Sequence, residues 1–253
     1  MTEAGALRFA RFAYPPNALG YCGPDAGATL LEYADAGATD RGLVELARGF
    51  EGAWPYLMLI AGAAGIADPL DPRVVDAYWL GGPLLERVGV GLLGPFLEET
   101  FRSGAGARWT GLAGLAATGA VPHHNLHVFG VYPWLGLLRL GREVGAMRVL
   151  DGCRIRHGRV VSVTGERAVV RQRALTWDGD RLAVGEPAER IAVAAENGRT
   201  FTRGLRTGDR VALHWDWICD RIGDEQARTL DAHTRRALDA ANRAGRPVGA
   251  ALD

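Results

Sequence analysis

The first 150 residues carry apolar side chains at the three- and four-residue spacing of helices. In residues 41–50, for example, Leu43, Ala47 and Phe50 fall on one face of a helix that Thr39-Asp40 can cap. Further helix starts are marked by a capping residue or a proline, at Asp25, Pro55, Asp71-Pro72, Pro95 and Pro122. Because such helices expose little polar surface, they must pack on one another, and we expect a mainly helical domain over residues 1–148.

After residue 150 the pattern changes to short, β-branched segments in which apolar and polar residues often alternate. These segments occupy residues 159–163, 166–175, 181–186, 190–194 and 209–215. Turn signals such as Thr164-Gly165 and Asn197-Gly198 separate them. Short strands so closely spaced predict a small barrel, and the acids-first, arginines-last segment from Asp224 predicts a final helix.

Charge and composition narrow the class of protein. The 253 residues are 48% hydrophobic and 23% charged, with 29 acidic and 29 basic side chains, and every basic one is arginine. This excludes chemistry that depends on a lysine of the chain, such as a Schiff base or a P-loop. Because acidic and basic residues are equal in number, the chain has no excess of positive charge of the kind found in proteins that bind nucleic acid or anionic membranes. We therefore expect neither as a partner.

The cysteines and the apolar runs bear on the compartment. Cys22, Cys153 and Cys219 are an odd number of widely separated thiols, unlike a secreted disulfide framework. The N-terminal residues show no signal-peptide pattern. The longest uncharged apolar run, between Glu51 and Asp68, is shorter than the roughly 20 residues that span a bilayer. We therefore expect a cytoplasmic protein whose cysteines are free thiols or metal ligands.

Two short motifs in the C-terminal half follow one another in a specific order. Cys153–Val163, CRIRHGRVVSV, begins with a cysteine and contains Gly158, and Gly208–His214, GDRVALH, ends with a histidine. In this order, and with the helix that follows, residues 149–253 resemble the HypC/HupF family of hydrogenase maturation chaperones. The resemblance implies a small OB-like β-barrel with a C-terminal helix. The whole chain is then expected to be an α+β protein with a mostly helical N-terminal domain.

The resemblance also implies a function. In that family the cysteine and the histidine serve an iron centre that carries cyanide and carbon monoxide. It implies that Cys153 and His214 bind such an iron intermediate, shared with a HypD-like scaffold protein and delivered to the precursor of a [NiFe]-hydrogenase large subunit. A thiolate is a soft ligand suited to low-valent iron, and a neutral imidazole is a compatible second donor. The expected role is that of an accessory or maturation factor rather than an enzyme.

Three features depart from the family pattern. Cys153 is internal, whereas the family's cysteine is the processed N-terminal residue. His157 stands where the family has a proline, and it is a further candidate ligand or a turn residue. The stretch 173–201 is longer than the compact family needs. The chain is therefore interpreted as a fused relative, whose task can differ from that of the family.

A second candidate metal site lies in the helical half, in the segment HHNLH. His123, His124 and His127 are three of the six histidines. If the segment is helical, His123 and His127 lie one turn apart on one face, which suits binding of one metal ion. The glutamate of the zinc-protease motif is replaced by His124, so protease chemistry is not expected. The competing interpretation is that these histidines cap or hydrogen-bond within a packed domain.

Cys22 is one more candidate ligand, in a Gly/Pro-rich loop before a helix. A nearby helix N-terminus would lower the pKa of its thiol and make it a better ligand or nucleophile, whereas the alternative is a buried structural thiol. The sequence thus leaves two functions open. One is a hydrogenase maturation factor that carries iron, with a second metal from Cys22 and the histidine cluster. The other is a metal-dependent enzyme that uses His123, His124 and His127, with the barrel as a recognition module.

Overall fold

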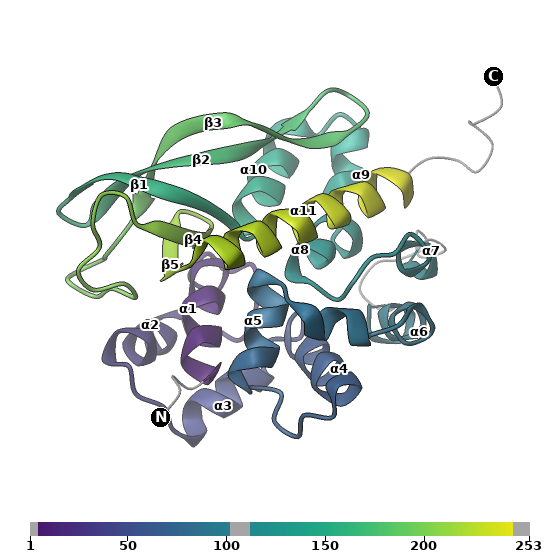
Figure 1. The fold of residues 1–253 in the computed structure, drawn as a ribbon, viewed down its shortest axis with the longest axis horizontal. Coiled ribbons are helices and arrows are strands. Elements are labelled where there is room, and N and C mark those ends of the chain that lie inside the picture. Colours follow the sequence, from purple (N-terminus) through teal and green to yellow (C-terminus); the bar gives the residue numbers. More distant parts are fainter. Residues whose placement is uncertain (1–4, 102–111, 245–253) are drawn as a thin grey trace.

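Helices make up the regular structure of the N-terminal half in the computed structural model, which describes residues 5–101 and 112–244 (Figure 1). They are α1 (Gly5–Ala18), α2 (Gly27–Ala36), α3 (Arg41–Arg48), α4 (Trp54–Ala64), α5 (Pro72–Leu80), the 3-10 helix η1 (Pro83–Arg87), α6 (Val90–Phe101), α7 (Leu112–Ala117), α8 (His124–Leu126), the π-helical turn η4 (His127–Val131), α9 (Trp134–Arg139) and α10 (Glu143–Cys153). None of the described helices is long and apolar enough to cross a membrane.

Most of the expected helix starts are observed, and the local chemistry explains them. Asp40 accepts a hydrogen bond from the Leu43 amide at 3.1 Å and caps α3. The prediction that Pro95 begins a helix was wrong, since α6 begins at Val90 and contains this proline. Pro95 removes only the amide that would bond to the Gly91 carbonyl, and both residues are exposed, so water can satisfy that oxygen.

The strands form a closed five-stranded barrel. They are β1 (Arg156–Thr164), β2 (Arg167–Trp177), β3 (Leu182–Val193), β4 (Arg210–His214) and β5 (Trp217–Arg221), and their order around the barrel is β1-β2-β3-β5-β4. The chain is therefore a mixed α and β protein, 52% helical, with helices before the sheet and one helix after it. This confirms the expected α+β class and the OB-like barrel.

Two details of the barrel differ from the sequence prediction. The segments 181–186 and 190–194 were expected to be separate strands, but they are parts of the single strand β3. Pro187 lies within β3 opposite Arg173, directly beside a register shift in β2. Because a proline donates no hydrogen bond, such an irregular position tolerates it without ending the strand. The second difference is the strand β5, which was not expected. A turn at Trp215 and Asp216 separates it from β4, the strand expected over residues 209–215.

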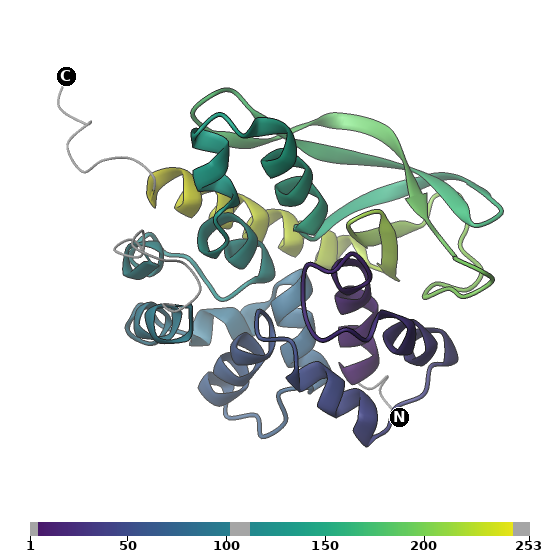
Figure 2. The same cartoon turned by 180° about the vertical axis from the view of Figure 1, so that it is seen from behind.

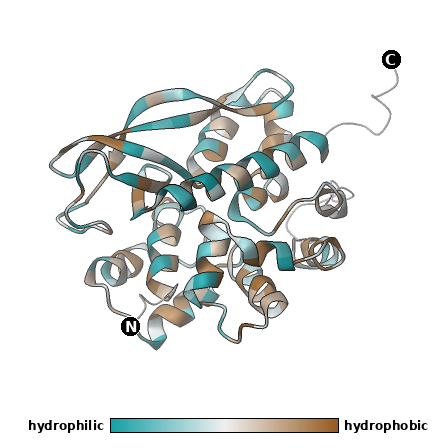
Figure 3. Cartoon of the chain, viewed as in Figure 1, coloured by the Kyte–Doolittle hydropathy of each residue, from teal (hydrophilic) through white to brown (hydrophobic). Residues whose placement is uncertain are grey.

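The C-terminal helix α11 (Asp224–Ala244) lies across the barrel and contacts β1, β3, α5, α7 and α8. Hydrophilic and apolar residues alternate along it (Figure 3), as expected for a helix with one buried face. Seen from behind, α9 and α10 also lie against the strands (Figure 2), and α10 contacts β2. Helix α10 extends across residue 148, so the expected boundary between domains 1–148 and 149–253 falls inside a helix.

Apolar packing also joins the two halves. One core cluster includes Phe12 and Tyr78 from the helical half together with Cys219 and Leu230 from the C-terminal half. A second, smaller cluster fills the barrel and includes Val160, Val170, Val211, Leu213 and Ile218. The interface between helices and barrel is therefore part of a continuous core, and the residues that face it are closed off from water.

Candidate metal centre

Three potential metal ligands meet at the interface between the helices and the barrel. They are His124 from α8, Cys153 at the end of α10 and His214 at the end of β4. One ligand atom from each lies within 4.8 Å of the other two, and all three residues are buried. The Cys153 sulfur lies 3.9 Å from His124 Nε2. Among the described residues, this is the group of His, Cys or acidic side chains close enough to share one ion.

A proline in α1 explains how His214 is oriented. The Phe12 carbonyl would normally accept a hydrogen bond from the amide four residues later, but that residue is Pro16, which has no N–H. The free carbonyl lies 2.6 Å from His214 Nδ1. A proton on Nδ1 donates to this carbonyl, which leaves a lone pair on Nε2. Within the described part of the chain, His214 Nε2 is buried and has no hydrogen-bond partner.

His124 is held by a tyrosine whose hydroxyl can act as donor or as acceptor toward the histidine ring. Tyr78 Oη lies 3.1 Å from His124 Nδ1 and 3.3 Å from the Gly52 carbonyl oxygen. With a proton on Nε2, His124 donates to the Cys153 carbonyl at 2.9 Å and accepts from Tyr78. With the proton on Nδ1, the ring donates to Tyr78, whose hydroxyl then donates to Gly52. The second arrangement gives up the bond to Cys153 and frees Nε2 to bind a metal ion.

Burial sets the charge of the three side chains. It raises the pKa of the Cys153 thiol far above its ordinary value, with a smaller effect of Cys22 in the same direction. Burial lowers the pKa of His124 to about 4 and that of His214 well below its ordinary value. Without a cation the pocket therefore holds a neutral thiol and two neutral imidazoles. A metal ion would bind the two imidazoles directly and would displace the thiol proton.

Aromatic rings surround the group and exclude water from it. The Trp79 ring centroid lies 4.7 Å from that of His124 and 5.7 Å from that of His214. Phe12 stacks on Trp79 with centroids 5.5 Å apart. Trp215 follows His214 with φ of 51°, and a Cβ on Gly152 would lie only 2.7 Å from its ring. Gly152 therefore allows the indole to pack directly beside Cys153.

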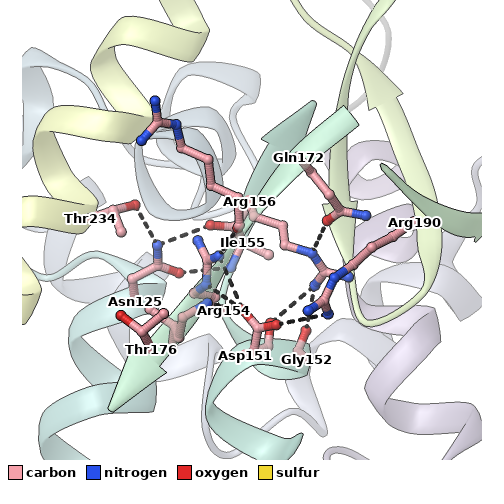
Figure 4. Close-up of polar contacts among 12 residues, drawn as sticks. Asn125, Asp151, Gly152, Arg154, Ile155, Arg156, Gln172, Thr176, Arg190 and Thr234 are labelled. Carbon is pink, nitrogen blue, oxygen red and sulfur yellow. Dashed lines mark hydrogen bonds and ion pairs between the residues drawn. The ribbon is translucent and has the colours of Figure 1, made fainter. Parts of the chain in front are cut away.

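A polar network fixes the segment between α10 and β1, and with it Cys153 (Figure 4). The side-chain amide of Asn125 donates to the Ile155 carbonyl at 3.1 Å and its oxygen accepts from the Ile155 amide at 2.8 Å. Arg154 forms an ion pair with Asp151 at 3.1 Å, and Arg156 donates to the Asp151 carbonyl at 3.0 Å. These bonds cross from α8 and α10 to the barrel, so they set the distance between His124 and Cys153.

The two other histidines of HHNLH face different surroundings. His123 is the N-cap of α8, since its Nδ1 accepts from the Asn125 amide at 3.0 Å, and its ring stacks on His233. This cap turns the His123 ring away from the group. His127 Nδ1 lies 3.1 Å from Tyr56 Oη, and its buried Nε2 has no hydrogen-bond partner among the described residues. The expected pairing of His123 and His127 on one helical face is not present.

Cys22 lies beside His127 rather than in the group. A Cβ on Gly52 would lie 3.3 Å from His127 Nε2, 3.4 Å from Tyr132 Oη and 3.9 Å from the Cys22 sulfur. Burial raises the pKa of Cys22 to about 11, although a hydrogen bond with Tyr132 opposes the shift. This is opposite to the lowered thiol pKa that a helix N-terminus would give. Cys22 and His127 are therefore neighbours of the candidate centre.

His157 also lies apart from the group. Its Nε2 is 3.0 Å from a carboxylate oxygen of Asp231 on α11, and its side chain is half-buried on β1. Burial raises the pKa of Asp231, but the hydrogen bond and charge of His157, with Arg235 and Arg173, produce a net decrease. This pair joins the barrel to the helix. His157 is thus used for contact with α11.

Sequence reasoning missed the residues that orient the ligands. Nothing in the sequence singles out Tyr78, because its role depends on His124, 46 residues away. Pro16 offered a usable signal, because a proline inside a helix always leaves one carbonyl free. No sequence feature indicates which side chain uses that carbonyl, since His214 is 202 residues from Phe12.

One known family covers both halves of the chain. Residues 1–247 match the model of DUF6390, a family of unknown function, and the chain belongs to this family. No curated protein and no solved structure matches the chain. The family match includes the helices that supply His124 and the barrel that supplies His214, so the ligand group lies entirely within the matched region.

Proposed function

We propose that the protein binds one iron ion through His124, Cys153 and His214, and acts as an accessory or maturation factor for a [NiFe]-hydrogenase. The observation that carries this proposal is the meeting of these three side chains at one buried point. Cys153 and His214 are the two residues that the HypC/HupF resemblance implies as iron ligands. The helical half adds His124 to them. The partners proposed are a HypD-like scaffold and the large-subunit precursor.

The donor set fits iron in a low oxidation state. One thiolate and two imidazoles form a set with one soft and two intermediate ligands, which suits iron but also zinc and copper. An iron ion with cyanide and carbon monoxide would bring its own remaining ligands, so the protein needs to supply few. The bound group would provide a preassembled centre for transfer. The protein's own part is to hold the ligands, exclude water through Trp79 and Trp215, and keep His214 in one tautomer.

The test is infrared spectroscopy with metal analysis, on full-length protein purified without oxygen from a hydrogenase-competent host. We expect bands of iron-bound cyanide and carbon monoxide and about one iron per chain. Cys153→Ser should lose both, whereas Cys219→Ser, which changes an equally buried thiol outside the group, should keep them. Full iron loading of Cys153→Ser would refute the assignment. Stoichiometric metal without those bands would retain the site but contradict the maturation role.

The composition of the site favours a role in carrying iron over a catalytic role. The group contains no carboxylate that could act as a general acid or base, and it is closed by aromatic rings. Of the HHNLH histidines only His124 takes part, so the alternative enzyme would need a different arrangement of His123 and His127. Metal binding that survives loss of Cys153 and His214 but disappears in a His123→Ala, His127→Ala double variant would favour the enzyme.

A further inference from the structure

A large groove runs between the barrel and the C-terminal helix, apart from the candidate metal centre. Its cavity volume is about 780 Å³, within the range of small-molecule sites. Strands β1, β2 and β3 form one wall, and α11 from Leu230 to Asn242 forms the other. The same elements lie side by side in Figure 1. The two walls together enclose a space in which a ligand can be contacted from both sides.

The groove is strongly basic. Eight arginines and two aspartates line it. Four of these arginines have partners within the protein. Arg154 pairs with Asp151, Arg156 donates to the Gln172 side chain and the Trp215 carbonyl, and Arg159 and Arg210 both approach Asp224. These four build the walls of the groove.

The other four arginines have fewer partners, and one of them, Arg173, donates to the Gly185 carbonyl at 3.3 Å. They are Arg171 and Arg173 on β2, Arg181 just before β3, and Arg235 on α11, and all four are exposed. Within the described ranges none of the four forms an ion pair. Asp231 and Asp239 are the acids that line the same space, and the charge of Asp231 acts on Arg173 and Arg235 as well as on His157. Two acids leave the eight arginines of the lining in clear excess. Like charges gathered from both walls repel one another unless an anion lies between them.

The uncharged residues of the groove indicate which kind of anion would fit it. Val184 and Pro187 of β3 are partly exposed apolar residues of the lining, beside the buried Leu182, Leu230 and Leu238, so part of the groove is apolar. His157 supplies the aromatic ring of the lining, and no Trp, Tyr or Phe of the described residues belongs to it. Nucleic-acid strands are held by successive aromatic platforms, which this groove lacks. A compact anion with an aliphatic part matches both portions of the lining.

We propose that this groove binds a small organic diphosphate. The guanidinium groups of Arg171, Arg173, Arg181 and Arg235 contact the phosphate oxygens, because a planar fork of N–H donors matches phosphate geometry. The aliphatic part of the ligand lies against Val184 and Pro187. This site is independent of the proposed metal function, since its lining includes none of His124, Cys153 and His214.

The experiment is isothermal titration calorimetry of the full chain with inorganic pyrophosphate and with a short alkyl diphosphate. We expect both to bind, the alkyl diphosphate more tightly. Arg171→Ala and Arg235→Ala, which remove one arginine from each wall, should each weaken pyrophosphate binding about tenfold and together about a hundredfold. Arg142→Ala, an exposed arginine outside the groove, is the matched control and should change nothing.

Three results would overturn the proposal. Equal weakening by Arg142→Ala would show non-specific attraction to arginine, and unchanged binding in the double variant would place the ligand elsewhere. Citrate binding as tightly as pyrophosphate would refute the preference for phosphate. Cys153→Ser should bind pyrophosphate normally, so a failure of the metal site and a failure of the groove are distinguished by the same set of proteins.

Discussion

Two tyrosines hold two neighbouring histidines in the same way, which provides a controlled test of the metal site. Tyr78 lies 3.1 Å from Nδ1 of His124, and Tyr56 lies 3.1 Å from Nδ1 of His127. Both tyrosines are fully buried. Only His124 belongs to the ligand group. Tyr78→Phe and Tyr56→Phe therefore each remove a hydroxyl group that contacts a histidine Nδ1, and Tyr78→Phe also removes the contact with the Gly52 carbonyl. Only Tyr78→Phe should affect a bound metal.

The expected sizes follow from the lost contacts. Each variant leaves a buried imidazole nitrogen without its partner, which should lower the free energy of unfolding by about 1–3 kcal/mol in both cases. Loss of a group that orients a metal-bound histidine typically reduces metal affinity by about 10–100-fold. We expect this reduction in Tyr78→Phe and less than about threefold in Tyr56→Phe.

The assay is a competition titration with a chelator, in which Co²⁺ reports thiolate binding by its charge-transfer absorption. Urea unfolding of the metal-free proteins measures the stability change separately. Equal affinity loss in the two variants would mean that general destabilisation, and not orientation of His124, weakens the metal. Wild-type affinity in Tyr78→Phe would refute the assigned role of this hydroxyl.

Further predictions concern the pH dependence of stability and substitutions of Gly158 in β1 and Pro16 in α1. Burial lowers the pKa of His124 from 6.5 to about 4, so as the pH falls the unfolded chain binds a proton at His124 before the folded chain does. The contribution of neutral His124 to stability is therefore complete above about pH 6.5 and is lost as the pH falls toward 4. Denaturant titrations at several pH values measure this loss. Gly158→Ala places a Cβ 2.5 Å from Val170 Cγ1 and should cost about 2 kcal/mol or more in urea unfolding, with wild-type stability contradicting the packing. Pro16→Ala supplies an amide that competes for the Phe12 carbonyl, and it should weaken Co²⁺ binding several-fold while leaving the melting temperature equal or higher; unchanged binding would show that this carbonyl does not orient the ligand.

Local chemistry explains which parts of the fold could be predicted. Asp40 and Asp71 cap α3 and α5 because their neighbours in sequence are their partners, and α11 follows from its own charge order. β3 was divided wrongly because Gly185 and Pro187 resemble a turn when considered alone. Pairing with β2 across 10 register positions keeps the segment extended. The cost of the proline is absorbed by the irregularity at Arg173.

The residues of the candidate site were also predictable only in part. Cys153 and His214 were named from short motifs, and they do lie together, because both are at ends of elements that meet at the barrel. The choice of His124 from three histidines could not be predicted. It depends on the His123 cap, which begins α8 at His124. It also depends on Tyr78, 46 residues from His124, and on Tyr56, 71 residues from His127. Contacts of that separation leave no periodic pattern in the sequence.

The three ligand atoms belong to three separate segments of the chain, and this has a kinetic consequence. An ion held by α8, α10 and β4 inside a continuous core would not escape by exchanging one ligand at a time with water. Its release rate would follow the rate at which the helices and the barrel separate, however strong or weak the individual bonds are. A partner that binds the barrel and moves β4 away from α8 would release the ion rapidly. A free chelator, even one of higher affinity, would remove the ion only at the rate of spontaneous opening.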